Sequence, residues 1–213
     1  MPYTYLLWDW NGTLLDDLQI SVDAVCDILK ETGLPPTTAE SYRSQIEIPT
    51  ERYYQKLFDL QRWPLSFLAE RYMQNYRRHI RRARLHKGAA EALAAFSNAG
   101  IRQALVSSFQ QQLLYELIDL FGIGGYFDFI SGAQDCFAKS KIERARNLLA
   151  EREISPSRTV VLGDMVHDAE MAAALGSDCI LLSCGHQSRE ALERCGLPIA
   201  ESLSEAAAWI LCR

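Results

Sequence analysis

Short, unbroken runs of apolar residues alternate along this chain with longer segments whose apolar positions follow helical spacing. The runs cover residues 5–8, 104–106, 160–162 and 180–182, with a weaker fifth at 127–130. Runs of this length are typical of strands that are buried on both faces of a parallel sheet. The alternation predicts an α/β fold, a Rossmann-like parallel sheet flanked by helices.

Glycine marks the ends of several expected helices. A stripe from Leu113 to Phe121 stops at Gly122, and the segment 169–175 stops at Gly176. Glycine just past a helix is common because it adopts the left-handed conformation without steric cost. These positions therefore support the strand-then-helix order of the main pattern.

Residues 16–85 depart from that order, because helical stripes follow one another there without an apolar run that predicts a strand. Thr38 and Thr50 are expected to cap two short helices in this stretch. The simplest organisation is a Rossmann-like core formed by 1–15 and 86–213, into which an all-helical cap domain, 16–85, is inserted.

Polar side chains follow three of the expected strands at the point where each strand ends. Asp9 follows the first run, Ser107 and Ser108 follow the second, and Asp164 and Asp168 follow the third. The carboxyl ends of parallel strands share one edge, which is where such sheets bind ligands. Taken singly, each cluster has an ordinary explanation as a turn or a helix cap. Their joint occurrence points to a site.

The same residues resemble the signatures of the haloacid dehalogenase superfamily, in order and over almost the whole chain. Residues 9–13 read Asp-Trp-Asn-Gly-Thr after an apolar strand, and Ser107 is the expected hydroxyl at the second strand. Lys141 is the expected lysine that opens a helix, with Lys139 as the second choice. Asp164 and Asp168 form the Gly-Asp-x-x-x-Asp signature with the preceding glycine. The helical stretch resembles the cap of the phosphoglycolate-phosphatase-like branch.

That resemblance implies a Mg²⁺-dependent hydrolase of small phosphate esters. Asp9 would be the nucleophile that forms an aspartyl-phosphate, and Ser107 and Lys141 would bind the transferring oxygens. The chemistry agrees, since phosphoryl transfer needs an in-line nucleophile, a cation and donors for the phosphoryl oxygens. The metal ligands would be Asp9, the backbone carbonyl of Asn11, Asp164 and Asp168; further substrate contacts would come from Thr13, Ser108 and Trp10.

Asn11 departs from the family pattern, in which an Asp at this position protonates the leaving oxygen. An amide donates a hydrogen bond but transfers no proton at neutral pH, and a general acid is typically worth about 10²–10⁴-fold. The alternatives are a slow phosphatase, a preference for good leaving groups, or another acid such as His167. A non-catalytic phospho-ligand-binding or regulatory protein and a phosphonate-cleaving relative are also open.

Composition limits the partners. The net charge is −5 and the pI about 5.4, unlike a generally basic nucleic-acid binder. No apolar run reaches the ~18 residues of a membrane span, and the N-terminus lacks the pattern of a signal peptide. We expect the chain to bind a small phosphorylated metabolite and neither nucleic acid nor a membrane. The expected oligomeric state is a monomer or a homodimer.

Six scattered cysteines fit reduced thiols in a cytoplasmic protein. Cys179, Cys184, His186 and Cys195 match no paired zinc spacing. The basic stretch 71–87 carries no acid, and its ordinary interpretation is a solvated helix face.

Overall fold

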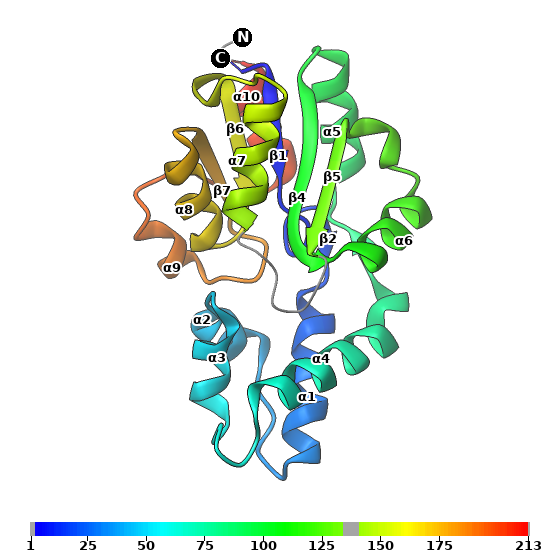
Figure 1. Ribbon diagram of the computed structural model, residues 1–213, viewed down its shortest axis with the longest axis vertical. Coiled ribbons are helices and arrows are strands. Elements are labelled where there is room, and N and C mark those ends of the chain that lie inside the picture. The colour runs from blue at the N-terminus through cyan, green and yellow to red at the C-terminus, as the bar shows by residue number, and fades with distance from the viewer. Residues whose placement is uncertain (1–2, 134–140, 213) are drawn as a thin grey trace.

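The computed structural model describes residues 3–133 and 141–212 of the 213-residue chain. Its centre is a six-stranded sheet in the order β5-β4-β1-β6-β7-β8, with every neighbouring pair parallel (Figure 1). The strands are β1 (Tyr5–Trp8), β4 (Arg102–Gln110), β5 (Phe129–Ala133), β6 (Thr159–Gly163), β7 (Asp178–Leu182) and β8 (Ile199–Ala200). This confirms the predicted Rossmann-like α/β fold.

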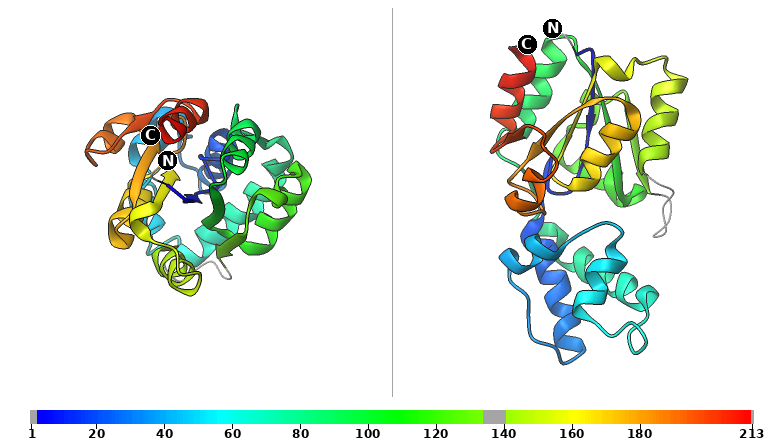
Figure 2. Two further views of the ribbon diagram at one scale, coloured as in Figure 1. Left: turned by 90° about the horizontal axis from the view of Figure 1, so that it is seen from above. Right: turned by 90° about the vertical axis from the view of Figure 1, so that its left-hand side faces the viewer.

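Helices cover both faces of this sheet, as the side view in Figure 2 shows. One face carries α5 (Ala89–Asn98), α6 (Gln111–Phe121) and α10 (Leu203–Leu211); the other carries α7 (Lys141–Glu151), α8 (Val166–Leu175) and α9 (Arg189–Glu193). In β1, Leu6 and Trp8 pack on the first face while Tyr5 and Leu7 pack on the second. Both faces are buried, which explains the continuous apolar run.

A second group of helices lies beyond the carboxyl ends of the strands (Figure 1). It consists of α1 (Leu18–Glu31), α2 (Ala39–Gln45), α3 (Thr50–Leu57) and α4 (Leu65–His79), which share a hydrophobic cluster of their own. Thr38 caps α2 by accepting a hydrogen bond from Ser41 N at 3.1 Å, whereas Pro49, not Thr50, precedes α3. The assignment of 16–85 as a cap domain stays a prediction.

Two short strands bound this helical part. β2 (Leu15–Asp16) pairs antiparallel with β3 (Arg84–Leu85), and His86 N donates to Leu14 O at 2.8 Å. The expectation that 16–85 contains no strand was therefore wrong at both ends. Two residues are too few to produce an alternating pattern, so these strands could not be predicted from the sequence.

The boundaries of two other strands also differ from expectation, and a third strand was not expected. β5 starts at Phe129 and extends to Ala133, through small residues with little strand preference. β4 continues through Ser107 and Ser108 to Gln110, and its register with β5 shifts between Val106 and Gln110. The two-residue β8 was not predicted. Short or irregular strands are set by pairing with neighbours more than by their own sequence.

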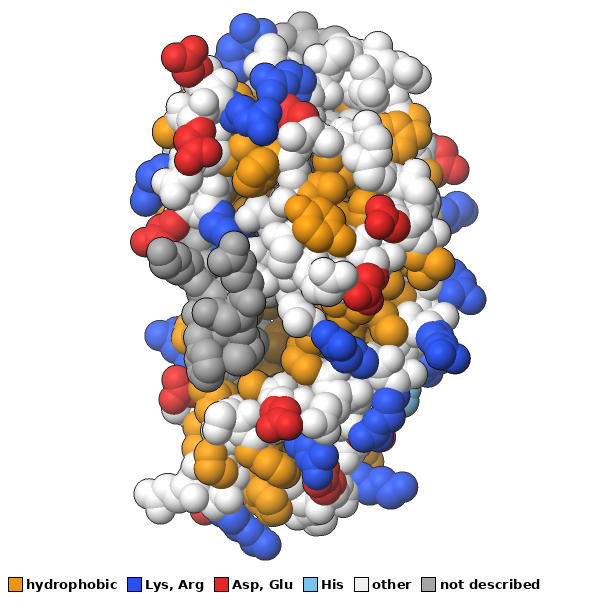
Figure 3. All heavy atoms as spheres, turned by 45° about the vertical axis from the view of Figure 1, so that its right-hand side comes forward, with side chains coloured by type: hydrophobic (Ala, Val, Ile, Leu, Met, Phe, Trp, Pro, Cys, Tyr) orange, Lys and Arg blue, Asp and Glu red, His pale blue; other side chains and the backbone are white. Residues whose placement is uncertain are grey.

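The basic stretch lies on α4 and the turn that follows it. Arg71 pairs with Glu31, and Arg82 pairs with Asp23. In Figure 3 the Lys and Arg side chains on this part of the surface are interspersed with acidic and hydrophobic ones. Such pairs are typical of a solvated helix face. None of the described helices is long and apolar enough to cross a bilayer.

Candidate active site

Three buried carboxylates meet at the carboxyl edge of the sheet. Asp9 follows β1 and Asp164 follows β6, and these strands are direct neighbours, with Trp8 paired to Leu162. Ligand oxygens of Asp9, Asp164 and Asp168 all lie within 4.8 Å of one another. Backbone pairing of two adjacent parallel strands thus brings together residues that are far apart in sequence.

The Lys141 ammonium lies between two of these carboxylates. Its Nζ is 2.8 Å from Asp9 Oδ1 and 2.5 Å from Asp168 Oδ1. Lys141 is the first residue of α7 and is only 3% exposed, so the helix delivers a cation into the buried group. Lys139, the second choice for this role, lies outside the described residues.

Burial shapes the electrostatics of the group. Removal from water raises the pKa of the Asp9 carboxyl, and it raises the pKa of Asp164 to about 7. Burial alone lowers the pKa of the Lys141 ammonium, but the carboxylates of Asp168 and Asp9 outweigh it, so that pKa rises. The lysine is therefore charged, and it does not by itself neutralise three carboxylates.

The donor set fits a hard divalent cation such as Mg²⁺. Carboxylate and carbonyl oxygens are its preferred ligands, and a second positive charge would offset the burial and the mutual repulsion that raise the pKa values of Asp9 and Asp164. Space for the Asp164 carboxylate is made by two glycines. A Cβ at Gly12 (φ 71°) or at Gly185 would lie 2.2 Å from Asp164 Oδ2.

Asp164 is held on both oxygens. Thr13 Oγ1 donates to its Oδ1 at 2.8 Å, and His186 N donates to its Oδ2 at 2.6 Å. The side chain is fully buried, so these donors replace water. Its ordinary explanation as a helix cap does not hold, because Met165 precedes α8.

Asp168 has both a structural and a site role. Its Oδ2 accepts hydrogen bonds from the backbone N–H groups of Asp164 and Met165, at 3.1 and 3.0 Å, in the first turn of α8. Its Oδ1 receives Lys141. The carboxylate is therefore fixed by the helix start while it faces the other charged groups.

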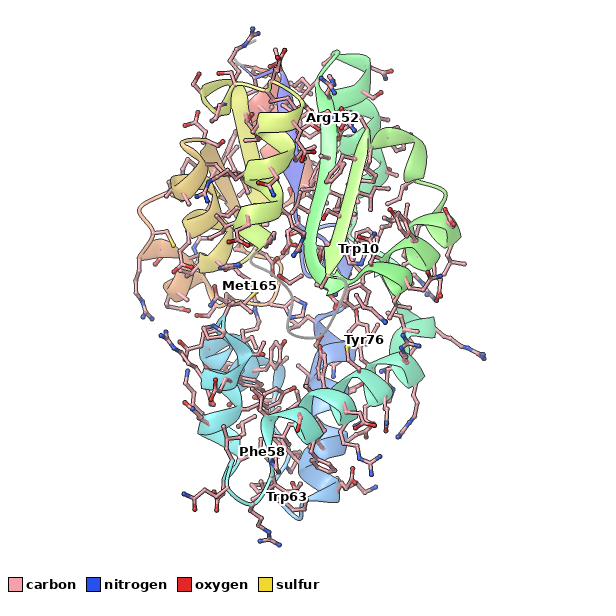
Figure 4. All side chains as sticks on the ribbon, in the orientation of Figure 1. Trp10, Phe58, Trp63, Tyr76, Arg152 and Met165 are labelled. Atoms are coloured by element: carbon pink, nitrogen blue, oxygen red, sulfur yellow. The ribbon has the colours of Figure 1, made fainter. Side chains whose placement is uncertain are left out.

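The remaining predicted residues differ in placement. Ser107 is buried inside β4, and its Oγ accepts from Phe109 N at 3.0 Å. Ser108 is exposed on the opposite side of the strand. Trp10 is fully buried in the hydrophobic core, with its ring 6.5 Å from that of Phe121 (Figure 4). The Trp10 ring, which was expected among the substrate contacts, thus packs in the core.

His167 is likewise not part of the carboxylate group. It lies in the first turn of α8, and its Nδ1 is 3.3 Å from Glu170 Oε2 on the same helix. This is an ordinary surface pair at i,i+3 spacing.

A second buried polar group borders Asn11. Asp17 Oδ2 accepts a hydrogen bond from Asn11 Nδ2 at 2.8 Å and from the Tyr76 hydroxyl at 2.7 Å. Asp17 Oδ1 accepts from Gly12 N at 2.9 Å and contacts His186 Nε2 at 2.9 Å. Three segments of the chain, the loop 11–12, α4 and the loop after β7, thus converge on one carboxylate.

The Asp17–His186 pair is charged. Burial alone lowers the pKa of the imidazole, but the Asp17 carboxylate outweighs it and raises the pKa of His186 to about 9. Burial alone raises the pKa of Asp17, and His186 outweighs that effect, so the pKa of Asp17 is lowered. Sequence reasoning gave neither residue a place in the site, and it considered His186 only as a possible zinc ligand. His186 follows β7, so inspection of that strand's end would have found it.

The loop after β7 also holds the helical part. Arg43 of α2 donates to the carbonyls of Ser183 and Gln187, and Ser188 N donates to Arg43 O at 3.0 Å. Gln187 Nε2 donates to Ile46 O at 2.9 Å. Figure 4 shows Met165 and Tyr76 at the level where the two parts meet. These hydrogen bonds therefore join α2 and the residue that follows it to the loop after β7, which also carries His186.

The sequence of this chain is similar to those of known proteins. The sequence profile described as "Haloacid dehalogenase-like hydrolase" matches residues 6–182. A phosphoglycolate phosphatase of Nitrosospira multiformis is 30% identical over 216 residues, which covers 97% of this chain and 95% of the relative. The tyrosine-protein kinase PtkA of Mycobacterium tuberculosis is 26% identical over 89% of this chain and 65% of its own length.

Solved structures share the fold. A haloacid dehalogenase-like family hydrolase from Streptococcus pneumoniae superposes with a TM-score of 0.85 at 21% identity, covering 98% of this chain and 99% of the other. CbbY from Rhodobacter sphaeroides, solved in complex with phosphate, superposes with a TM-score of 0.71 at 20% identity, covering 95% and 96%. At these identities the likeness concerns the fold alone.

Proposed function

This chain belongs to the haloacid dehalogenase-like hydrolase family, and from that premise we propose that it is a phosphatase of small phosphate monoesters that uses Mg²⁺. The observation that carries the proposal is the buried group of Asp9, Asp164 and Asp168 with Lys141 between two of them. Such a group holds a nucleophilic oxygen and cation ligands at one point, as phosphoryl transfer requires.

Asp9 is the nucleophile in this proposal. One of its carboxylate oxygens attacks phosphorus, the bond from phosphorus to the ester oxygen breaks, and the leaving group departs with the bonding electrons. Water then attacks the phosphorus of the aspartyl-phosphate, which releases phosphate and restores Asp9. Lys141 holds the Asp9 carboxylate in place and faces the transferring oxygens with a positive charge.

The cation would be held by Asp9, Asp164 and the backbone carbonyl of Asn11, with Asp168 as a direct ligand or as the partner of a metal-bound water. Bound there, it supplies charge neutralisation and orientation for a dianionic phosphate beside buried carboxylates. Thr13 and His186 N fix Asp164 in the orientation that such a ligand needs.

Ser107 binds a phosphoryl oxygen in this proposal. It lies two residues past Leu105, whose partner Trp8 precedes the nucleophile, so Ser107 lies at the edge of the sheet where Asp9 follows β1. Exposed Ser108 and core-bound Trp10 are not included among the substrate contacts. The loop 46–50 is a candidate for selecting the substrate, because Gln187 ties Ile46 to the sheet-bearing part.

The experiment is an assay with an aryl phosphate in Mg²⁺ and in excess chelator, followed by a screen of phosphorylated metabolites that includes phosphoglycolate. Rapid acid quench and peptide mass spectrometry should find a phosphate adduct on the peptide that contains Asp9. Metal-dependent turnover with that adduct supports the proposal. A chain that binds phosphate but turns over none of the esters would instead be the non-catalytic phospho-ligand-binding protein.

A further inference from the structure

The Asn11 side chain is oriented by what surrounds its nitrogen. Nδ2 donates one hydrogen to Asp17 Oδ2 at 2.8 Å and lies 3.1 Å from the Tyr76 hydroxyl. The Tyr76 hydroxyl gives its own hydrogen to Asp17, so its oxygen accepts from Asn11. Both amide hydrogens are therefore taken.

Asp17 decides which end of the amide faces inward. Its Oδ2 receives Asn11 and Tyr76, and its Oδ1 receives Gly12 N and His186. A carboxylate accepts but does not donate, so it binds the NH₂ end of the amide and excludes the oxygen end.

The amide oxygen must face the other way. Asp17 and Tyr76 are 1% and 0% exposed, so the Nδ2 end of Asn11 is enclosed, yet Asn11 as a whole is partly exposed. No residue within the described ranges 3–133 and 141–212 donates to Asn11 Oδ1. The open end of position 11, two residues after Asp9, is thus an acceptor.

We propose that Asp17 is a positioning residue that turns the Asn11 amide oxygen toward the substrate, and that the site thereby selects phosphate monoesters whose leaving group carries a hydrogen-bond donor beside the scissile oxygen. This rests on the proposed phosphatase function. A hydroxyl or ammonium at that place satisfies Asn11 Oδ1. A leaving group without a donor displaces the water at Asn11 Oδ1 and leaves this oxygen unpaired, which costs free energy.

The test compares 2-hydroxyethyl phosphate with ethyl phosphate as a matched pair. Wild-type kcat/KM should favour the hydroxyethyl ester by roughly fivefold, the worth of one neutral hydrogen bond. In Asp17→Asn the acceptor-only group is gone and the amide can turn, so this ratio should fall toward that of the uncatalysed reaction. The intrinsic reactivity difference between the esters cancels when variants are compared.

Two further variants separate orientation from general disturbance. Ser21→Ala removes the weaker 3.4 Å contact with Asp17 but leaves Asn11 untouched, so the ratio should stay at the wild-type value. Tyr76→Phe removes one partner of Nδ2 but keeps the carboxylate, so the ratio should also persist. A wild-type ratio equal to that of the uncatalysed reaction, or a ratio that Asp17→Asn leaves unchanged, overturns the inference.

A measurement without turnover distinguishes this inference from the proposed function. In nuclear magnetic resonance spectra of the wild-type protein, the Asn11 side-chain NH₂ should exchange slowly and show an Overhauser effect to the Tyr76 ring. A fast-exchanging NH₂ without that contact overturns the amide orientation, even if esters are hydrolysed. Slow exchange together with absent hydrolysis would reject the phosphatase proposal and keep the orientation.

Discussion

The ammonium of Lys141 lies 2.8 Å from the Asp9 carboxylate, and both residues are almost fully removed from water. Asp168 is the second anionic partner of the same ammonium, at 2.5 Å. One cation thus offsets repulsion between buried carboxylates, which ties the stability of this region to the chemistry proposed for it.

Lys141→Met should therefore lower both activity and stability. Loss of one partner from a buried ion pair typically costs about 3–5 kcal/mol, because the remaining charge is uncompensated. Urea unfolding in chelator should show this loss, and added Mg²⁺ should restore part of it. The matched control is Lys30→Met, at an exposed position near the end of α1. Equal stability of the two variants in chelator would contradict the role given to Lys141.

Asp9→Asn should lower turnover by at least about 10³-fold, as expected for a lost nucleophile. The fold should persist, because burial already disfavours the charged form of Asp9, as its raised pKa indicates. Turnover, circular dichroism and the melting temperature are the measurements. Asp119→Asn, on the exposed side of α6, controls for the change of charge. Activity comparable to wild type in Asp9→Asn would reject the proposed mechanism.

Asp164→Asn should weaken Mg²⁺ binding by about tenfold or more, since it removes a charged oxygen ligand. Titration calorimetry of the protein with Mg²⁺ measures this without reference to activity. Glu170→Gln, on the same helix-bearing segment but exposed, should bind Mg²⁺ like wild type. Full wild-type activity after dialysis against excess chelator would count against any cation at this site.

Moving the carboxylate from position 17 to position 11 should raise kcat/KM for alkyl esters more than for aryl esters. Asn11→Asp alone places two carboxylates together, so a small gain or a loss is expected. The double variant Asn11→Asp/Asp17→Asn places an acid beside an amide, and its kcat/KM for an alkyl phosphate should rise about tenfold or more over wild type, with a smaller gain for an aryl phosphate.

Peptide mass must first exclude spontaneous deamidation at the Asn-Gly sequence in every preparation. A single Asn11→Asp variant that equals the double variant would show that Asp17 does not restrict the acid. Equal gains for the alkyl and aryl esters would show that position 11 does not protonate the leaving group.

The stability of the protein without metal should fall as the pH rises from about 6.5 to 9. His186 has a pKa raised to about 9 in the folded chain, against the ordinary value near 6.5. Its contribution to stability is therefore complete below pH 6.5 and is lost as the pH rises to about 9. The full contribution is on the order of 3 kcal/mol. Unfolding in urea at several pH values with chelator measures it.

His186→Gln should flatten that slope, because the group that releases the proton is gone. His79→Gln, which removes a more exposed contact with Asp27, should keep it. An identical slope in the His186→Gln variant would show that the Asp17–His186 pair does not carry this pH dependence.

The sequence predicted the sheet edge well and the second polar group poorly. Residues 5–8 and 160–162 were visible as buried strands, so the meeting of Asp9 with Asp164 followed from parallel pairing. Trp10 could not be placed in the same way, because the direction of a loop side chain depends on the packing around Phe121. The position of Trp10 next to Asp9 in the sequence therefore did not indicate where its ring lies.

Asp17 illustrates a different limit. Before a helix, an aspartate is ordinarily expected to cap it, and Asp17 does precede α1, but its side chain makes no capping hydrogen bond. Its partners Tyr76 and His186 come from distant segments. Only the docking of α4 and the loop after β7 against the start of α1 brings them together, and no local pattern encodes that docking.

The pairing of β2 with β3 has a consequence for how such a chain can change. Because Leu15 lies opposite Leu85, the chain leaves and rejoins the sheet-bearing part at a single place. An insertion or deletion between α1 and α4 therefore leaves the register of β1 with β4 and β6 unaltered. The lengths of these helices can therefore change while the paired strands that lead to Asp9 and Asp164 keep their places in the sheet.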